Sequence, residues 1–595
     1  MLILICELLE GKNTNSIPII RHLFEFFRFR AHDRGKAMDC TCAMTGQSFT
    51  VTDEELAFLR QVSPVIADKT FLIPPPQLCP DCRQQRRLTY RNERTFYRRT
   101  CSQCGRNILA LYPADAPCPV FCDTCYWGDR WDPLQYGFPF DPSQPFFTQF
   151  AVLQRTVPHL FFSSTNSENS EYCNHVSFMK NCYLVHGSMH SQNCYYSTRA
   201  FRCSDCMDCL FINDCELCYE CVNCDECYDV RHAYHCQGCH TSCWIQHCHA
   251  SRDLLFCVNR RQAQYQILNQ QKTRGEYERI KGEIDASPEA QKRFLADFQH
   301  LLLDSPIPSR IVDLAEACTG NYIRQCRSCH HVFDAQKCQN VRFGFDTEAM
   351  NDCQDIYSVY GPGELCYELY SANNAHSTLF SHDCWPAEDL LYCDHCFGCS
   401  KCFGCLGLHK KSYCILNRQY TKEEYEALTP RIIEHMQHGK EFGEFFPAKH
   451  SPFAYNETPA QEYFPMTRGA VEQRGWAFRE QRDEMPNVSR VIRSTRLPVQ
   501  IEDVPDDILN WAVECEVTKR PFKIIKQELD FYRKMHVPVP HVHPDERHRR
   551  RMNLRNPRKL WNRQCANCQK PIATSYSPDR PETVYCEECY LKEVY

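Results

Sequence analysis

Four cysteines near each end of the 595-residue chain have the spacing of ligands for one tetrahedral metal ion. Each set reads C-x2-C-x17-C-x2-C, and two sulfurs three residues apart can grip the same ion. The two sets are Cys101, Cys104, Cys122 and Cys125, and Cys565, Cys568, Cys586 and Cys589. We expect one closed, structural zinc site in each set, because four thiolates leave no coordination position for water.

The two sets belong to a duplicated module, since every cysteine of the second lies 464 positions after its counterpart in the first. Neighbouring residues match in the same register, as Tyr126 does with Tyr590. Cys118 lies close to the first set, but its counterpart is Glu582. We therefore predict that Cys118 is not a ligand.

A less regular cluster precedes each four-cysteine set. At the N-terminal end its ligands for a third zinc ion are Cys42, Cys79 and Cys82, with Cys40 as a candidate fourth, although C-x-C is a tight spacing for one ion. At the C-terminal end the corresponding candidates for a fourth ion are Cys515, His543 and His548. Glu546 stands there in the register of Cys82, so one thiol is replaced.

Arginine-rich stretches lie between the two clusters at each end. On a helix, arginines at positions 83, 87, 91 and 94 share one side, and such a side could hold phosphates while aromatic neighbours stack on bases. The alternative is that the arginines pair with carboxylates of this chain. The candidate nucleic-acid contacts are Arg83, Arg86, Arg87, Arg91, Arg549, Arg550 and Arg555.

The 44 cysteines favour metal sites and buried thiols over a secreted disulfide scaffold. Disulfide-rich domains are short and follow a signal peptide, whereas this chain begins with only about six apolar residues and has no cleavage pattern. No apolar stretch approaches the roughly 20 residues of a membrane helix. We expect a cytoplasmic protein with reduced thiols. The net charge of −6 argues against a uniformly basic nucleic-acid coat.

The middle of the chain is a second duplication, with an offset of 148. The string beginning at Tyr265 recurs at Tyr413, and each copy ends in a strand-like Tyr-x-Ile-Leu-Asn followed by a Thr-x-x-Glu pattern that opens a helix. Short segments such as Asn181-Cys182-Tyr183 recur every nine to sixteen residues, which is typical of strands in a solenoid. We predict small β-solenoids with inward cysteine ladders. A multi-zinc cluster is the alternative, because cysteines also run at three-residue steps, as from Cys218 to Cys227.

We therefore expect a multidomain, β-rich chain, with duplicated zinc-ribbon, treble-clef-like modules at both ends flanking two tandem cysteine-rich β-solenoid-like repeats. The predicted segments are a leader or mis-assigned start (1–37), an N-terminal double zinc module (38–135), a first cysteine-rich copy (136–285), a helical linker (286–311), a second copy (312–442), an aromatic and proline-rich connector (443–510) and a C-terminal zinc module (511–595).

Four strings give the chain a family resemblance: PPPQLCPDCRQQRRLTYRNER, KSYCILNRQYTKEEYE, EFFPAKHSPFAYNETPAQEYFP and PDERHRRRMNLRNPRKLW. With these, the chain from Cys40 to Tyr595 resembles the long cysteine-rich zinc-ribbon proteins of candidate-phyla (Patescibacteria-type) bacteria. Some members carry a CaiB/BaiF CoA-transferase name, but this sequence has neither a nucleotide fingerprint nor a doubly wound pattern. The family often has a cysteine where this chain has Thr45.

Three functions remain open at this stage. The first is a zinc-binding, non-enzymatic scaffold that binds a macromolecule, either protein or RNA. The second is an RNA- or ribosome-associated protein that uses the arginines. The third is a thiol- or zinc-dependent enzyme, which would need an exposed thiolate or a metal with an open position. The sequence indicates no catalytic residues, no membrane partner and no small-molecule substrate.

Overall fold

The structure is a computed structural model that describes residues 37–360, 363–369, 375–480 and 486–594. The predicted leader over residues 1–37 lies, except for residue 37, outside this part of the chain. Within it the protein is multidomain and rich in β-structure, and its cysteines are free thiols. No described helix has the length and apolar character needed to cross a membrane.

The N-terminal module is built from short antiparallel hairpins and helices. Hairpin β1–β2 and hairpin β5–β6 each precede a helix whose first turn follows a cysteine. The elements are β1 (Met38–Thr41), β2 (Ser48–Val51), α3 (Asp53–Val62), β3 (Val65–Ile66), β4 (Lys69–Thr70), α4 (Pro80–Leu88), β5 (Tyr97–Thr100), β6 (Asn107–Ala110), β7 (Val120–Phe121), α5 (Asp123–Tyr126), η1 (Pro133–Tyr136), α6 (Phe146–Thr156) and β8 (His159–Leu160).

A first stack of parallel strands follows, in which partners are twelve residues apart. Thr198 pairs with Leu210, Leu210 pairs with Val222, and the same step continues to the end of the stack. The strands are β9 (Ser164–Thr165), β10 (Val176–Ser177), β11 (Thr198–Phe201), β12 (Leu210–Asn213), β13 (Glu216–Tyr219), β14 (Val222–Asp225), β15 (Tyr228–Tyr234), β16 (His240–Gln246), β17 (Arg252–Val258), β18 (Gln264–Ile267) and β19 (Gln270–Gln271).

Each twelve-residue coil turns at every third residue, where the backbone has positive φ. Asn181, Asn193 and Asp208 fit the expected turn residues, since Asn and Asp tolerate this conformation. Leu184 and Tyr196, however, adopt it too, with φ of 52° in each. The turns are therefore set by the stacking of successive coils, not by local turn propensity alone.

Cysteines fill the interior of the first stack at three-residue steps. Their thiols donate to backbone carbonyls of their own coil and the next one, as Cys203 Sγ does to Phe201 O (3.2 Å) and Ile212 O (3.6 Å). Burial raises the pKa of Cys209 to about 11 and that of Cys257 to about 12, so these groups are neutral thiols at pH 7. Such thiols act as small apolar side chains.

A second stack repeats this arrangement with irregular steps. The coil-to-coil step is twelve residues at Gly320–Val332, eleven at Val312–Ile323 and thirteen at Cys353–Cys366. Its strands are β21 (Val312–Asp313), β22 (Gly320–Arg324), β23 (Val332–Gln336), β24 (Gln339–Arg342), β25 (Phe345–Glu348), β26 (Asn351–Gln354), β27 (Tyr357–Tyr360), β28 (Cys366–Tyr367), β29 (Ala375–His376), β30 (Ala387–Leu391), β31 (Cys399–Phe403), β32 (Cys414–Ile415) and β33 (Arg418–Gln419). Strand β20 (Ile307–Pro308), which precedes them, pairs instead with β39 (Val584–Tyr585) near the C-terminal end.

Helices follow both stacks, as the Thr-x-x-Glu patterns predict. Thr273 and Glu276 form the capping box of α7 (Arg274–Ala286), and Thr421 and Glu424 form that of α9 (Lys422–His438). Both helix predictions are confirmed. Helix α8 (Pro288–Asp304) connects α7 to the second stack.

The connector packs back over other parts of the chain. Phe445, Phe446 and Tyr455 belong to the large apolar core that also holds residues of α4, α6 and the second stack. Its elements are η2 (Ala448–His450), η3 (Tyr455–Glu457), α10 (Pro459–Tyr463) and α11 (Arg468–Gln473). The aromatic residues of this segment therefore fix the N-terminal module to the second stack.

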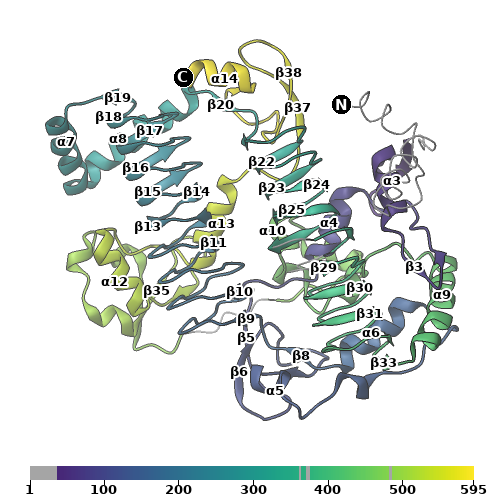
Figure 1. Cartoon of the computed structure of the whole chain (residues 1–595). Coiled ribbons are helices and arrows are strands. Elements are labelled where there is room, and N and C mark those ends of the chain that lie inside the picture. The colour runs from purple at the N-terminus through teal and green to yellow at the C-terminus, as the bar shows by residue number, and fades with distance from the viewer. Residues whose placement is uncertain (1–36, 361–362, 370–374, 481–485, 595) are drawn as a thin grey trace, which may run out of the picture.

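The C-terminal module repeats the hairpin and helix order of the N-terminal one. Its elements are β34 (Arg490–Arg493), η4 (Ser494–Arg496), η5 (Ile501–Asp503), η6 (Asp506–Asn510), β35 (Trp511–Glu514), β36 (Pro521–Phe522), α12 (Lys526–Met535), α13 (Pro544–Leu554), β37 (Trp561–Gln564), β38 (Pro571–Thr574), β39 (Val584–Tyr585) and α14 (Glu587–Val594). The two stacks stand side by side, with α13 against the first and α4 against the second (Figure 1).

Candidate metal centres

The N-terminal four-cysteine group forms where a hairpin turn meets a helix start. After β5, Cys101 N–H donates to Arg106 O (2.8 Å) and Gly105 N–H donates to Cys101 O (3.0 Å), which closes a tight loop. Gly105 has φ of +73°, a conformation in which a side chain would be strained. Cys122 caps α5, and its N–H donates to Cys101 Sγ (3.3 Å). The loop and the helix start thus bring all four sulfurs together.

The C-terminal group repeats this geometry bond for bond. Cys565 N–H donates to Lys570 O (2.9 Å), Gln569 N–H donates to Cys565 O (2.9 Å), and Cys586 N–H donates to Cys565 Sγ (3.2 Å). The sulfurs of Cys565, Cys568, Cys586 and Cys589 all lie within 4.8 Å of one another. The sequence therefore located both groups correctly.

The sulfur separations fit a zinc ion. Tetrahedral Zn–S bonds of about 2.3 Å place neighbouring sulfurs about 3.8 Å apart. Cys104 Sγ lies 3.9 Å from Cys122 Sγ, and Cys568 Sγ lies 3.8 Å from Cys586 Sγ. These cysteine groups can hold metal ions without rearrangement.

The electrostatics of each group favour a thiolate at one cysteine, whereas burial and hydrogen bonds to the other sulfurs raise the pKa of Cys125 to about 12, and the same two influences raise that of Cys589 to about 12. Burial opposes ionisation, yet N–H groups of Cys104 and Cys122 lower the pKa of Cys101 to about 6. The same balance, with N–H groups of Cys568 and Cys586, lowers the pKa of Cys565 to about 6. A thiolate is the form that binds metal. By contrast, Cys118 lies outside the group, and burial raises its pKa to about 11.

The third cluster contains three cysteines, not four. Cys42, Cys79 and Cys82 come together in a buried group, with Cys79 capping α4. The Cys42 loop copies that of Cys101: Cys42 N–H donates to Gln47 O and Gly46 N–H donates to Cys42 O, both at 2.8 Å. Thr45 stands where the other loops have their second cysteine.

Cys40 is not part of this group, so its prediction as a ligand is wrong. It lies on β1 opposite Phe49, and the group of sulfurs that lie within 4.8 Å of one another holds Cys42, Cys79 and Cys82 without it. Burial raises the pKa of Cys42, whereas hydrogen bonds to its sulfur from the Cys79 backbone and the Thr45 side chain lower it. The net effect is a lowered pKa. The fourth coordination position therefore faces a hydroxyl.

The C-terminal counterpart of this third cluster has the same loop conformation but does not bring its candidate ligands together. Cys515 N–H donates to Arg520 O (3.0 Å) and Lys519 N–H to Cys515 O (3.1 Å), as in the other loops. His543, however, uses Nδ1 to cap α13 by accepting from Asp545 N–H (3.1 Å). His548 contacts Glu462 Oε1 at 3.2 Å. Among the described residues, Cys515, His543 and His548 do not form a ligand group, so the fourth predicted site is not supported.

Most of the predicted nucleic-acid contacts are buried, which corrects that prediction. On α4, Arg83 and Arg87 contact Asp355, at 2.8 and 3.3 Å, with all three side chains fully buried. Arg86 contacts Glu368 and Glu444, both at 2.6 Å. These arginines join the N-terminal module to the second stack and are not open to a phosphate.

The remaining arginines divide into two kinds. Arg91 contacts Glu93 at 2.6 Å, and Arg555 contacts Asp334, and both arginines are buried. Arg549 and Arg550 are exposed and contact Glu546 on their own helix. Only these two of the predicted arginines present a cationic group to solvent.

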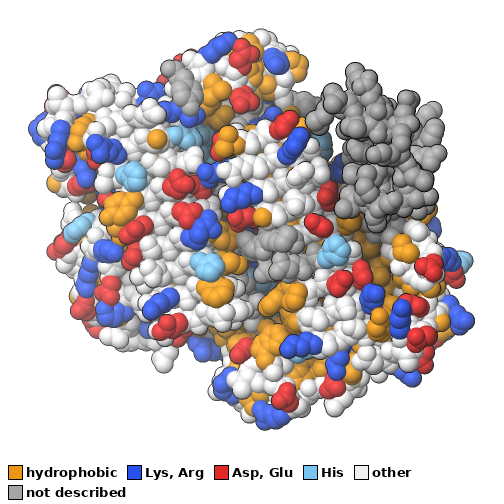
Figure 2. Space-filling view, in the orientation of Figure 1, with side chains coloured by type: hydrophobic (Ala, Val, Ile, Leu, Met, Phe, Trp, Pro, Cys, Tyr) orange, Lys and Arg blue, Asp and Glu red, His pale blue; other side chains and the backbone are white. Residues whose placement is uncertain are grey.

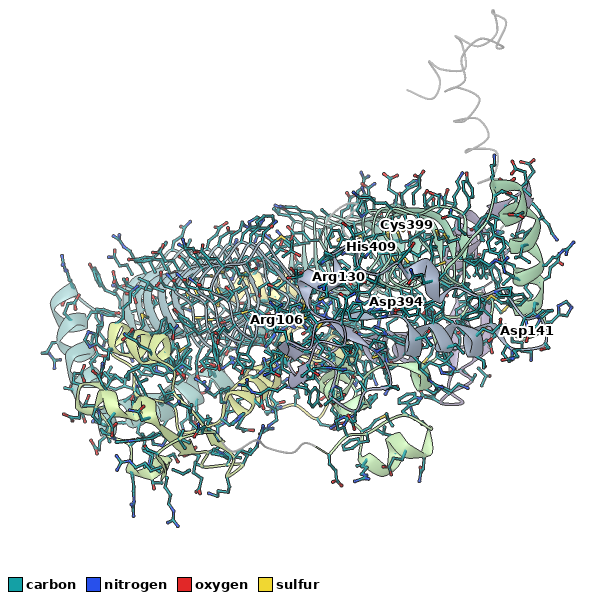
Figure 3. The ribbon with its side chains drawn as sticks, turned by 90° about the horizontal axis from the view of Figure 1, so that it is seen from below. Arg106, Arg130, Asp141, Asp394, Cys399 and His409 are labelled. Atoms are coloured by element: carbon teal, nitrogen blue, oxygen red, sulfur yellow. The ribbon has the colours of Figure 1, made fainter. Side chains whose placement is uncertain are left out.

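A histidine–carboxylate group was missed by the sequence reasoning. His382, Asp394 and His395 lie on the second stack, with ligand atoms close enough to share an ion. Asp394 and His409 of this stack are both labelled in Figure 3. The N-terminal module packs against the stack near this group, since the rings of His409 and Trp127 stack with their centroids 4.9 Å apart. The twelve-residue step, which places position 382 over position 394, is the signal that could have revealed the group.

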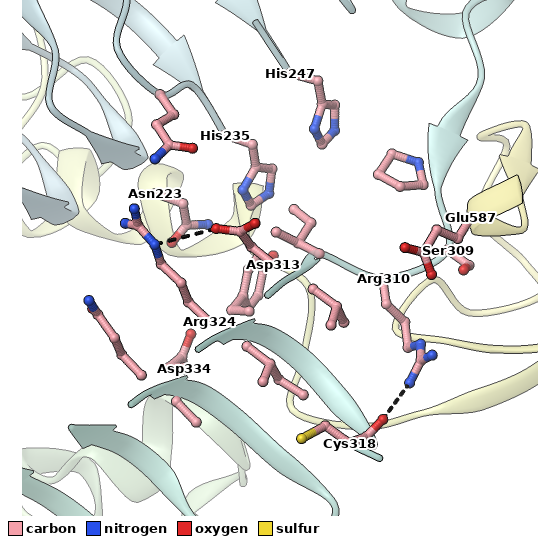
Figure 4. Close-up of a pocket in the computed structure, with 18 of the residues that line it drawn as sticks. Asn223, His235, His247, Ser309, Arg310, Asp313, Cys318, Arg324, Asp334 and Glu587 are labelled. Carbon is pink, nitrogen blue, oxygen red and sulfur yellow. Dashed lines mark hydrogen bonds and ion pairs between the residues drawn. The ribbon is translucent and has the colours of Figure 1, made fainter. Parts of the chain in front are cut away.

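A large cavity lies between the stacks, beside the C-terminal metal group. It has a volume of about 1060 Å³ and is lined by both stacks and by the C-terminal module. His235 and His247 stack on one another at 5.0 Å, and Tyr322 stacks on His235 at 5.1 Å. Figure 4 shows both imidazole rings directed into the cavity.

Comparisons with known proteins add no assignment. No family model matches this chain, and no curated protein does. A crystal structure of a protein described as an acetyltransferase from Desulfovibrio desulfuricans G20 matches at 10% identity over 48% of this chain and 82% of that chain. Its TM-score of 0.09 is too low to carry an argument about fold or function.

Proposed function

We propose that this protein is a zinc-stabilised, non-enzymatic scaffold of the cytoplasm that binds a segment of a partner protein between its two stacks. In this proposal the stacks are β-solenoids with cysteine ladders, and the duplicated terminal modules are zinc ribbons. The zinc is structural, because each four-sulfur group already fills a tetrahedral shell.

The cavity between the stacks is the observation that carries the proposal. His235 and His247 are 6% and 3% exposed, and in the described part of the chain their Nε2 atoms have no hydrogen-bond partner. Buried polar atoms are satisfied in nearly all native structures, so an unsatisfied pair facing a cavity favours a bound ligand. A roomy site with aromatic walls and a few polar groups is typical of binding clefts.

The charges around the cavity favour a polypeptide over a nucleic acid. Arg324 contacts Asp313 and Asp225, at 3.4 and 3.5 Å, so its charge is already balanced. Arg310 donates to Cys318 O at 3.3 Å. Lys and Arg side chains alternate with Asp and Glu over the face seen in Figure 2, without a continuous basic stripe. A duplex or single strand would need such a stripe.

Binding of RNA remains the second candidate because Arg549 and Arg550 project into solvent from α13. Their charges are shared with Glu546, which weakens their attraction for phosphates. This candidate predicts binding that is independent of the cavity and falls steeply with salt.

Filling the cavity tests the proposal. His249 lines the cavity and is half-buried, so His249→Trp inserts a large ring there, while His300→Trp on exposed α8 is the matched control. Each full-length variant is crosslinked in a bacterial lysate and recovered with and without nuclease. We expect a partner protein to be recovered with the wild type and with His300→Trp, whether or not nuclease is added. The same partner should be absent from the material recovered with His249→Trp. Material that nuclease releases and that is recovered equally with His249→Trp supports RNA binding. If nothing recovered depends on the cavity, the proposal is contradicted.

A further inference from the structure

Two histidines and two aspartates form a compact square on the outer side of the second stack, where they are largely shielded from water. His382 and Asp394 are bridge partners on successive coils, and the adjacent residues Asp383 and His395 are stacked in the same way one position later. Each histidine thus faces one aspartate across the coils and another beside it. The square arises from the twelve-residue step and from no local motif.

The hydrogen bonds of the square orient both imidazole rings. Asp394 Oδ1 accepts from His382 Nδ1 at 2.7 Å and from His395 Nδ1 at 2.5 Å. With both Nδ1 atoms held by this carboxylate, the Nε2 atoms face the second carboxylate. His382 Nε2 lies 3.7 Å from Asp383 Oδ2, and His395 Nε2 lies 3.8 Å from the same oxygen.

We propose that His382, Asp383 and His395 bind a divalent first-row transition metal ion through the two Nε2 atoms and Asp383 Oδ2, with Asp394 as the carboxylate that orients both histidines. Metal-binding histidines almost always donate their other ring N–H to such a partner. Zinc bonds of 2.0–2.2 Å to nitrogen and oxygen separate tetrahedral ligand atoms by about 3.3–3.6 Å. The two separations to Asp383 exceed this range by only a few tenths of an ångström.

Charge and burial fit an ion at this position. The side chains of His382, Asp383 and Asp394 are 5%, 11% and 5% exposed, while that of His395 is 23% exposed. Metal binding displaces any protons that the imidazoles carry, and a divalent cation then balances the two carboxylates that are shielded from water. Arg91 of the N-terminal module, whose charge also acts on Asp383, is itself paired with Glu93 at 2.6 Å.

The donor atoms distinguish this site from the thiolate groups. Imidazole and carboxylate select zinc, cobalt, nickel or ferrous ions over the softer ions that thiolates prefer, and two histidines with one carboxylate leave coordination positions open. Because His395 is partly exposed, an ion can enter and leave without unfolding of the stack. We therefore expect a weaker, exchangeable site beside the tightly held zinc.

Cobalt binding to the full-length, zinc-loaded protein tests the proposal. After dialysis against a mild chelator, Co²⁺ is added and followed by calorimetry and visible absorption. We expect one Co²⁺ per chain with weak d–d bands and no sulfur-to-cobalt charge-transfer band. His382→Gln and His395→Gln should each weaken binding by at least tenfold, and Asp394→Asn by roughly 10- to 100-fold. His300→Gln, on exposed α8, should leave binding unchanged.

Two results would overturn the proposal. One is that the wild-type protein binds no more Co²⁺ than the His382→Gln/His395→Gln double variant, as a purely ion-paired square requires. The other is X-ray absorption of wild-type protein in which the added Co²⁺ has sulfur neighbours and no imidazole scattering. The second measurement needs no variant, so it decides the matter even if a substitution prevents folding.

Discussion

Tyr590 donates its hydroxyl to Asn259 Oδ1 at 2.8 Å and so ties the C-terminal metal module to the last coil of the first stack. Tyr126, its counterpart in the N-terminal module, approaches Gly407, which lies 148 positions after Asn259. A Cβ atom on Gly407 would lie 3.6 Å from the Tyr126 hydroxyl. Each terminal module thus contacts the stack that is more distant in sequence, in addition to the nearer one, where Asn174 Nδ2 donates to Asn92 O and Asn321 Nδ2 donates to Ser575 Oγ.

Several buried arginines also join a terminal module to the more distant stack, whereas Arg555 joins the C-terminal module to Asp334 of the nearer stack. Helix α4 of the N-terminal module contacts Asp355 of the second stack, whereas Arg547 and Arg551 of α13 contact Asp208 of the first, at 2.6 and 2.7 Å. Buried ion pairs of this kind contribute little net stability when intact, but they are costly to break. A variant that lost one partner of such a pair would leave the other charge buried and unpaired, which destabilises the contact between the module and the stack.

Removing one sulfur from either four-cysteine group should remove one zinc ion. Cys104→Ser and Cys568→Ser each leave three thiolates, and because zinc binding supplies much of the folding energy of such modules, the thermal unfolding of that module should occur at lower temperature. Metal analysis and calorimetry measure both effects. Cys118→Ser is the matched control, and an unchanged zinc content in Cys104→Ser would contradict the assignment.

Completing the third cluster should tighten its metal binding. Thr45→Cys places a fourth thiol in the loop of Cys42, opposite Cys79 and Cys82, so zinc should resist a chelator for longer. Thr518→Cys makes the same change beside Cys515, where His543 and Glu546 replace two thiols, and should give no gain. Zinc retained after timed chelation is the measurement. A loss of zinc in Cys40→Ser would show that Cys40 is a ligand after all.

Neutralising Asp355 should destabilise the contact between α4 and the second stack. Asp355→Asn leaves Arg83 and Arg87 buried without their carboxylate, which typically costs about 3–5 kcal/mol. Asp214→Asn is the control, because Asp214 and Arg202 are 45% and 48% exposed and such pairs contribute only about 0–1 kcal/mol. Urea unfolding of both variants tests this. Equal midpoints would show that the buried charges are dispensable.

Stability should fall in mild acid because His247 is buried as a neutral ring. Burial, followed by the charges of His249 and Arg261, lowers the pKa of His247 to about 3 from an ordinary value near 6.5. Below about pH 6.5 the unfolded chain binds a proton that the folded chain does not, so the free energy of unfolding falls by about 1.4 kcal/mol per pH unit until about pH 3. His247→Gln should flatten this dependence, whereas the exposed His300→Gln should not. If the free energy of unfolding of the wild type and of His247→Gln fell in parallel with decreasing pH, His247 would not be the source of the effect.

The native protein should expose few reactive thiols. Among the described cysteines only Cys104 and Cys568 are exposed, and Cys40, Cys243 and Cys318 are half-buried. With metal bound we expect slow alkylation confined to the three half-buried cysteines, and chelation should add the thiols of the two four-cysteine groups. Mass spectrometry of alkylated peptides provides the measurement. Rapid labelling of Cys209 in native protein would contradict its place in a buried ladder.

The metal groups could be predicted because their geometry is local. A loop closed around Gly105 and a helix capped by Cys122 bring four sulfurs together within 25 residues, and the duplication confirmed which cysteines matter. Cys40 was misjudged because cysteine spacing does not show that its side chain, opposite Phe49 on β1, stays outside the group of sulfurs.

The roles of the arginines and of the histidine square depend on distant contacts. Arg83 looks like a solvent-facing cation until Asp355, 272 residues later, is placed against it. Likewise His382 and His395 carry no ligand spacing unless the exact step between coils is known. The sequence indicated repeated short strands but left their step between nine and sixteen residues, so side chains on successive coils could not be aligned.

The crossed packing has a consequence for the order in which the chain matures. At roughly 5–20 residues per second of synthesis, Asp355 emerges some 14–54 seconds after Arg83, which it must pair with. The N-terminal four-cysteine group can bind a metal ion as soon as it is made, but α4 stays without its buried partners until the second stack has been made. The C-terminal module is made later still and must then reach back to the first stack, where Arg547 pairs with Asp208. Each of these long-range contacts therefore forms only after the segments between its partners have been made.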